Sequence, residues 1–227
     1  MKNNAHPCTP APARCLPVLA ALAAGAALFM AGCGALPDKP VRATLYDFGP
    51  NLAAAVAPAS ANAAALPPIA LAEIDASVRL EGTQLLYRLG YSDPNELRPY
   101  GKARWSLAPA QLLHQRLRDA LAARRTVLGP EESATIARAE GRVPDTLRVT
   151  LDEFSHYFES PAASVGLVRL RATLIRGGSG GDRVLAQRSF AVQRPAPTPD
   201  AAGGVKGLAA ASDAAVAELV AWVEQPR

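Results

Sequence analysis

The sequence contains few of the residues that most often carry catalytic or metal chemistry. Among its 227 residues, only three are cysteine and three are histidine. His114 and His156 lie in the body of the chain, where no cysteine is present to complete a zinc site. Adjacent Asp152 and Glu153 would point to opposite faces of a strand, and GxSxG, Walker and dinucleotide-binding glycine motifs are absent. We therefore predict no catalytic residues, no metal site and no enzymatic activity.

The sequence also lacks a strong charge of either sign. Its 24 lysines and arginines oppose 20 aspartates and glutamates, which leaves a formal net charge of +4. The arginines are scattered and do not form a basic run. Nucleic-acid binding needs a concentrated positive surface, so we predict no nucleic-acid partner.

One long apolar run is present near the start of the chain. Residues 16–32 carry no charge, and the residues before them include Lys2 and Arg14 but no acid. A basic head, an apolar middle and small residues at the end are typical of a secretory signal peptide, here residues 1–32. The run is shorter than the roughly 20 residues of a spanning helix. An uncleaved membrane helix remains the alternative.

The run ends in LFMAGCG, in which Met30-Ala31-Gly32-Cys33 resembles a bacterial lipobox. This resemblance implies a diacylglycerol on the Cys33 sulfur, cleavage before Cys33 and an N-acyl group on the new terminus. We expect no other cofactor. The other cysteines, Cys8 and Cys15, would be removed, and Gly34 after the lipidated residue favours the outer membrane over the inner one. Several acyl chains anchor a protein firmly, since each buried CH₂ contributes about 0.8 kcal/mol.

The rest of the chain divides into a tether and one domain. We assign residues 33–44 to the lipid-anchored tether and residues 45–227 to a single domain, a length that supports a hydrophobic core. Two segments rich in alanine and proline, residues 50–68 and 194–204, are predicted to be connectors.

Periodicity predicts an α+β fold. Strict alternation indicates half-buried strands at residues 147–154, 168–176 and 183–192, with the glycine-rich segment 177–182 as a hairpin loop. Residues 45–49, 69–80 and 84–90 are predicted to be further strands. Helical spacing predicts amphipathic helices over 106–125, with Ser106 as its cap and Pro109 in its first turn, and over 205–223. The simplest arrangement is a two-layer sandwich, with a mainly antiparallel sheet and both helices on one face.

An aromatic and basic segment joins the predicted strand 84–90 to the first helix. Tyrosine and tryptophan combine an apolar body with a polar tip, which suits protein interfaces. The candidate docking residues are Tyr87, Arg88, Tyr91, Tyr100, Arg104 and Trp105. The alternative is that these aromatics pack the end of the core, and the two interpretations are compatible.

The order of several motifs resembles one protein family. These motifs are Leu86-Tyr87-Arg88, Tyr100, Trp105, Pro109, Leu113, Phe154, Gln187-Arg188-Ser189-Phe190 and Trp222. Together with the lipobox, they are similar to the ABC-type transport auxiliary lipoproteins, the PqiC-like family. The resemblance implies a non-enzymatic role at the periplasmic face of the outer membrane, with an MCE-domain periplasmic protein and ABC transporter subunits as partners.

Such systems move phospholipid or other hydrophobic molecules between the membranes, and a homo-oligomer would suit docking to a symmetric MCE assembly. Two other functions remain open from the residues alone. One is an envelope assembly lipoprotein that partners a β-barrel, and the other is a periplasmic enzyme with an unrecognised site.

Overall fold

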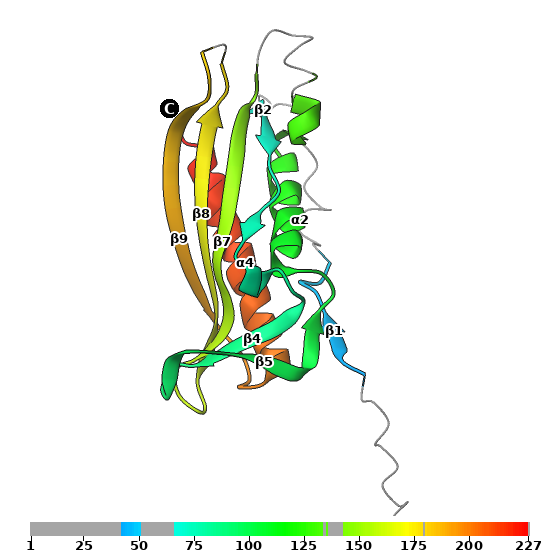
Figure 1. Ribbon diagram of the computed structural model, residues 1–227, viewed down its shortest axis with the longest axis vertical. Helices are drawn as coiled ribbons and strands as arrows, with labels where there is room; N and C mark the ends of the chain where they lie inside the picture. The colour runs from blue at the N-terminus through cyan, green and yellow to red at the C-terminus, as the bar shows by residue number, and fades with distance from the viewer. Residues whose placement is uncertain (1–41, 51–65, 134, 136–142, 179, 227) are drawn as a thin grey trace, which may run out of the picture. The chain divides into compact units, whose positions relative to one another are not determined.

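The fold is built on one nine-stranded mixed sheet (Figure 1). The computed structural model describes residues 42–50, 66–133, 135, 143–178 and 180–226. The strands are β1 (Thr44–Tyr46), β2 (Leu66–Leu71), β3 (Asp75–Ala76), β4 (Gln84–Leu89), β5 (Asp93–Trp105), β6 (Arg125–Leu128), β7 (Asp145–Phe158), β8 (Ser164–Arg176) and β9 (Arg183–Pro195). The helical elements include the 3₁₀ turn η1 (Val78–Leu80), α2 (Pro109–Ala122) and α4 (Ala201–Val223). The predicted signal peptide and Cys33 lie outside the described residues.

Strand β7 organises the sheet. One of its edges pairs with β8 in a long antiparallel ladder, and β8 pairs in turn with β9. The other edge of β7 receives β2, β3 and β4 in succession, all parallel to it. The hairpin β4–β5 is antiparallel, whereas β1 adds to β5 in parallel and β6 adds to β2 in parallel. The longest ladders are thus antiparallel, as predicted, while the short strands make the sheet mixed.

The three long strands have one-sided burial where their sequences alternate, whereas residues 154–156 of β7 and 164–166 of β8 are buried in succession. In β7, Leu147, Val149 and Leu151 are at most 1% exposed, whereas Arg148 between them is exposed. The register shifts between Leu151 and Glu153, which marks a β-bulge. Because a bulge adds one residue to one strand, Phe154 returns to the buried face instead of pointing outward.

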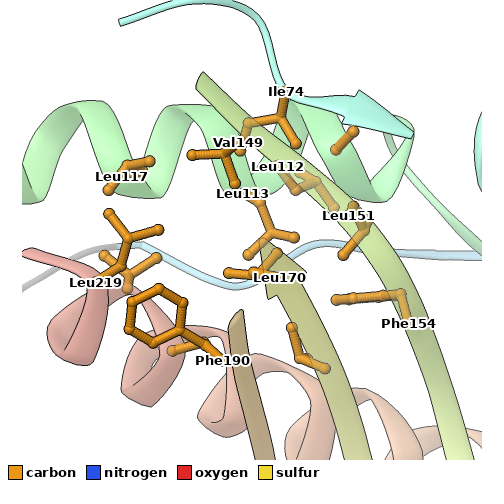
Figure 2. Close-up of a cluster of buried hydrophobic side chains, with 14 of the residues drawn as sticks. Ile74, Leu112, Leu113, Leu117, Val149, Leu151, Phe154, Leu170, Phe190 and Leu219 are labelled. Carbon is orange, nitrogen blue, oxygen red and sulfur yellow. The ribbon is translucent and has the colours of Figure 1, made fainter. Parts of the chain in front are cut away.

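Helices α2 and α4 cover the buried face of this sheet, and α2 packs against α4 as well as β6. Figure 2 shows Leu113 and Leu117 from α2, Val149 from β7 and Leu219 from α4 directed into one cluster. The two-layer α+β arrangement is therefore confirmed. Among the described residues, no helix has both the length and the apolar character needed to cross a membrane.

Both helices begin and end at different residues from those predicted. Helix α2 starts at Pro109 after Ala108, without a side-chain cap, so the prediction that Ser106 caps it was wrong. Its end is also earlier, because Arg125 begins β6. Helix α4 starts at Ala201 because the Asp200 carboxylate accepts a hydrogen bond of 2.7 Å from the Gly203 amide.

Three further expectations about the strands need correction. The predicted strand 69–80 is divided into β2, β3 and η1, and the last residues of the predicted connector 50–68 belong to β2. Residues 51–65 of that connector lie outside the described part of the chain. The predicted connector 194–204 is mostly structured, since its ends belong to β9 and α4. Strand β5 was not predicted at all, because its sequence does not alternate and includes two prolines and a glycine.

Candidate functional site

The predicted docking segment forms the β4–β5 hairpin and its continuation toward α2. The hairpin turns directly after Leu89, whose carbonyl accepts a hydrogen bond of 2.9 Å from the Ser92 amide. Tyr91 lies at this turn and is 48% exposed. The same hairpin packs along β7, with Tyr87 in register with His156. The predicted residues are therefore distributed between an exposed tip and the interior of the domain.

Four rings form a cluster behind this tip, which we call the aromatic cluster: Tyr87, Tyr100, His156 and Phe158. The Tyr87 and Tyr100 rings are 4.7 Å apart between centroids, and the His156 and Phe158 rings are 4.4 Å apart. A hydrogen bond of 2.9 Å joins the Tyr100 hydroxyl to His156 Nδ1. Tyr87 and Tyr100 retain partial exposure, so they connect the surface to the buried histidine.

Burial keeps His156 neutral. Its side chain is inaccessible to solvent, and Nε2 has no hydrogen-bond partner among the described residues. Loss of hydration lowers the pKa of His156 to about 4, although the negative charge of Asp200 opposes this shift. Burial also raises the pKa of Tyr100 above its ordinary value. His156 is therefore part of the packed interior.

Glycines bring α4 against this cluster. A Cβ on Gly204 would lie 2.4 Å from His156 Nδ1, and a Cβ on Gly166 of β8 would lie 2.2 Å from the backbone carbon of Gly207. Only residues without a side chain allow the helix to approach so closely. The sequence showed these glycines, but no periodicity relates position 166 to position 207, so their pairing could not be predicted.

Arg88 is held inside the fold by both its charge and its planar shape. Its guanidinium makes two hydrogen bonds of 3.1 Å to the Glu153 carboxylate, and both side chains are mostly buried, at 14% and 12% exposure. The same group donates to the carbonyls of Pro94 and Asn95. Arg88 therefore ties β4, β5 and β7 together, which leaves few donors for a partner.

Trp105 lies in the core, which removes it from the predicted docking surface. It is 1% exposed, and its ring makes edge-to-face contacts with Phe48 at 5.6 Å and Phe154 at 5.5 Å. Arg104 beside it donates to the carbonyls of Tyr100 and Ala103. For these two residues the structure supports the interpretation of core packing, because the Trp105 ring packs among other core rings and the Arg104 guanidinium is hydrogen-bonded within the domain.

The backbone at residues 48 and 49, which follow β1, is held by a buried arginine. Arg116 of α2 donates to the carbonyl of Phe48 at 2.8 Å and forms an ion pair of 3.2 Å with Asp213 of α4. Two shallow hollows of about 240 and 390 Å³ flank residues 47–49. Within the described residues, no group of three or more potential metal ligands occurs. The described part of the domain thus offers surfaces and hollows, and no assembled metal site.

Comparisons with known proteins agree with a transport accessory. The family model described as "ABC-type transport auxiliary lipoprotein component" matches residues 50–221. No match was found among curated proteins. A solved structure of a DUF330-family protein from Xanthomonas campestris is similar, with a TM-score of 0.59 and 21% identity over 69% of this chain and 82% of that chain.

A second solved structure, of an uncharacterised protein, has a TM-score of 0.54 and 15% identity over 81% of this chain and 99% of that chain. At these identities, both structures support the fold alone. The family match, in contrast, extends over most of the sequence and over every long element of the sheet. The chain belongs to the family of ABC-type transport auxiliary lipoprotein components.

Proposed function

We propose that this lipoprotein is the outer-membrane-anchored component of an MCE-type ABC transport system. Its role would be to bind an MCE-domain periplasmic protein and to connect the ABC transporter to the outer membrane. The match of residues 50–221 to the auxiliary lipoprotein family is the observation that carries this proposal. The cargo would be phospholipid or another hydrophobic molecule, and the lipoprotein would act by tethering and docking.

The anchor in this proposal is Cys33, with a diacylglycerol on sulfur and an acyl group on its amino terminus. Residues 34–43 separate Cys33 from β1, and ten extended residues reach roughly 35 Å at most. Figure 1 shows β1 and the β4–β5 hairpin at one end of the domain, with the β8–β9 hairpin at the other. Strand β1, which follows the proposed tether in the sequence, therefore lies at the end of the domain that carries the β4–β5 turn and Tyr91.

We place the docking surface at this end, on Tyr91 and the accessible parts of Tyr87 and Tyr100. Tyr91 is the most suitable anchor residue because its side chain is large, amphipathic and 48% exposed. Arg88, Arg104 and Trp105 would support the surface from inside and would not touch the partner. A homo-oligomer would multiply this surface around a symmetric partner.

Site-specific photo-crosslinking in native membranes tests the partner. A photoreactive residue at position 91 should capture an MCE-domain protein together with transporter subunits. The matched control is position 143 at the other end of the domain, where Val143 is 41% exposed and lies close to Gly177 of the β8–β9 hairpin loop. Capture of a β-barrel protein without an MCE-domain protein would replace this proposal with a role in envelope assembly, and equal capture at both positions would refute the docking surface.

Membrane fractionation and mass spectrometry test the anchor separately. Cys33→Ser should release the folded protein into the soluble periplasmic fraction, and the wild-type peptide that begins at Cys33 should carry the mass of the acyl groups. Separation of inner and outer membranes on a density gradient should place the wild type in the outer-membrane fraction. Membrane recovery of Cys33→Ser, or an unmodified Cys33, would contradict lipid anchoring.

A further inference from the structure

Strand β9 forms a long margin of the sheet. It has 13 residues, Arg183–Pro195, and among the described residues it pairs with β8 alone. Figure 1 shows β9 as the outermost of the three long strands. Most globular proteins shorten, twist or cover such an edge, because its free amide and carbonyl groups can accept another strand.

Strand β9 is held in place by its neighbours within the domain. Strand β9 follows β8 in register along nearly its full length, with one irregularity near Ile175. Helix α4 packs beneath both strands, and Phe190 of β9 contacts Trp222 of α4 with ring centroids 5.9 Å apart. A strand that adds to a fixed template loses only its own conformational freedom, which favours binding.

The charges on β9 all have one sign. Arg183, Arg188 and Arg194 are exposed, and Arg183–Pro195 contains no aspartate or glutamate. Within the described residues, none of these arginines forms an ion pair, although Arg188 lies 5.0 Å from the centre of the Phe190 ring. The register pairs Arg188 with Ala172 and Arg194 with Gly166, so both lie on the helix-covered face of the sheet.

This charge pattern disfavours a second copy of the chain as the occupant. Two β9 edges placed side by side would bring six arginines into one interface, and like charges on neighbouring strands are destabilising. An acidic strand would instead place carboxylates beside the guanidinium groups, which accept them in bidentate geometry.

We propose that the free edge of β9 binds an extended acidic segment of a partner protein by strand addition. Backbone hydrogen bonds to β9 supply the affinity, and the three arginines supply the preference for carboxylates. This mode of recognition adds a strand to an existing sheet without rearranging it. The site lies on a different strand from Tyr91 and does not depend on the identity of the transport partner.

Peptide binding to the purified full-length lipoprotein tests the proposal. The probe is a ten-residue peptide of alternating glutamate and valine, labelled for fluorescence anisotropy. One control replaces glutamate with lysine, and another keeps every glutamate but replaces two valines with proline, which cannot complete a strand ladder. The alternating acidic peptide should bind at least tenfold more tightly than either control, and it should slow hydrogen exchange at alternate amides of β9 at least tenfold.

A pair of variants separates the edge from overall charge. Arg183→Glu with Arg194→Glu should reduce peptide affinity at least tenfold, whereas Arg118→Glu with Arg148→Glu changes the net charge equally and should leave affinity nearly unchanged. Circular dichroism and thermal unfolding confirm that both proteins are folded. Equal binding of the proline-containing peptide, unchanged exchange at β9, or self-association of the chain through β9 would each overturn the proposal.

Discussion

Strand β7 passes through two regions that are stabilised differently. Between Asp145 and Leu151 it buries the aliphatic side chains of Leu147, Val149 and Leu151. Between Glu153 and Phe158 it contributes to a region of rings, a buried histidine and an arginine–carboxylate pair. The bulge after Leu151 separates these two halves.

This difference shows which interactions depend on residue pattern and which depend on residue identity. The amino-terminal half needs apolar side chains of suitable volume on one face, a requirement that many sequences satisfy. The carboxyl-terminal half needs a glycine at position 204 to admit the His156 ring, and a hydroxyl at position 100 to bind its nitrogen. We therefore expect single substitutions to have sharper and more varied effects in the carboxyl-terminal half.

The largest loss of stability should follow Trp105→Ala. Trp105 belongs to β5, but its ring packs on Phe154 in the carboxyl-terminal half of β7. Removing the indole would leave a cavity between Phe48 and Phe154, and the free energy of unfolding should fall by about 4 kcal/mol. Trp105→Phe should cost less than about 1.5 kcal/mol, because Nε1 has no hydrogen-bond partner among the described residues. Urea unfolding measures both. Similar losses for the two variants would contradict the importance of ring volume.

Gly166→Ala should lower the free energy of unfolding by about 3 kcal/mol. The added methyl would collide with the backbone of α4 at Gly207, so helix and sheet would have to separate. Gly101→Ala is the matched control, because a Cβ added there would meet no atom within 4 Å and the φ of Gly101 is not positive. The control should change stability by less than about 0.5 kcal/mol. A Gly166→Ala protein as stable as the control would show that α4 can move away from β8 freely.

The amino-terminal half of β7 and the long strands beside it could be predicted well from the sequence. Alternation in the segments around Leu147, Leu170 and Phe190 identified three long strands and their buried faces. A period of two predicts a strand, and the apolar positions of the same period mark the face that is buried. The same reasoning failed for β5, whose side chains satisfy irregular contacts with β4 and β1. It also failed at the start of α4, where Asp200 caps the helix within a segment rich in proline and glycine.

The candidate site was predictable only in part. The aromatic composition of residues 87–105 indicated an unusual region, but composition could not separate exposed Tyr91 from buried Trp105. That distinction depends on β1, which brings Phe48 onto the Trp105 ring from a distant part of the chain. Likewise, the sequence indicated only that Asp152 and Glu153 would point to opposite faces of a strand. The ion pair between Glu153 and Arg88 depends on the parallel pairing of β4 with β7, which no local pattern predicts.

Acidification should destabilise the carboxyl-terminal half through His156. Its pKa is about 4 in the folded protein, below its ordinary value of 6.5, so the unfolded chain binds the extra proton between these values. Stability should therefore fall by about 2–3 kcal/mol as the pH decreases from about 6.5 to 4, with no further contribution from this group below 4.

Chemical denaturation of the wild type and His156→Gln across this pH range isolates the effect. Glutamine can still bind the Tyr100 hydroxyl but does not titrate. Asp200 also faces His156, and its pKa is lowered by hydrogen bonds from Gly203 and Thr198, so its own contribution is lost below its ordinary value of 3.8. Parallel pH profiles for the two proteins above pH 4 would show that His156 is not the titrating group.

The arginine–carboxylate pairs offer a smaller test of the same comparison. Arg88→Ala should reduce stability by about 2 kcal/mol, because Glu153 would remain mostly buried without its partner. Arg171→Ala removes a more exposed pair with Asp152 and should cost less than about 1 kcal/mol. A double-mutant cycle with Glu153→Gln measures the coupling energy for Arg88. A coupling near zero would mean that Arg88 acts through its bonds to Pro94 and Asn95 alone.

Tyr91→Ala should have the smallest effect on stability and a large effect on binding. The side chain lies at an exposed turn, so its removal should change the free energy of unfolding by less than about 0.5 kcal/mol. Capture of the partner by a chemical crosslinker in native membranes should fall at least fivefold. Val143→Ala removes another exposed apolar side chain at the other end of the domain and should leave capture unchanged. If Tyr91→Ala retained full capture, the docking surface would have to lie elsewhere, and the aromatic end of the domain would serve packing alone.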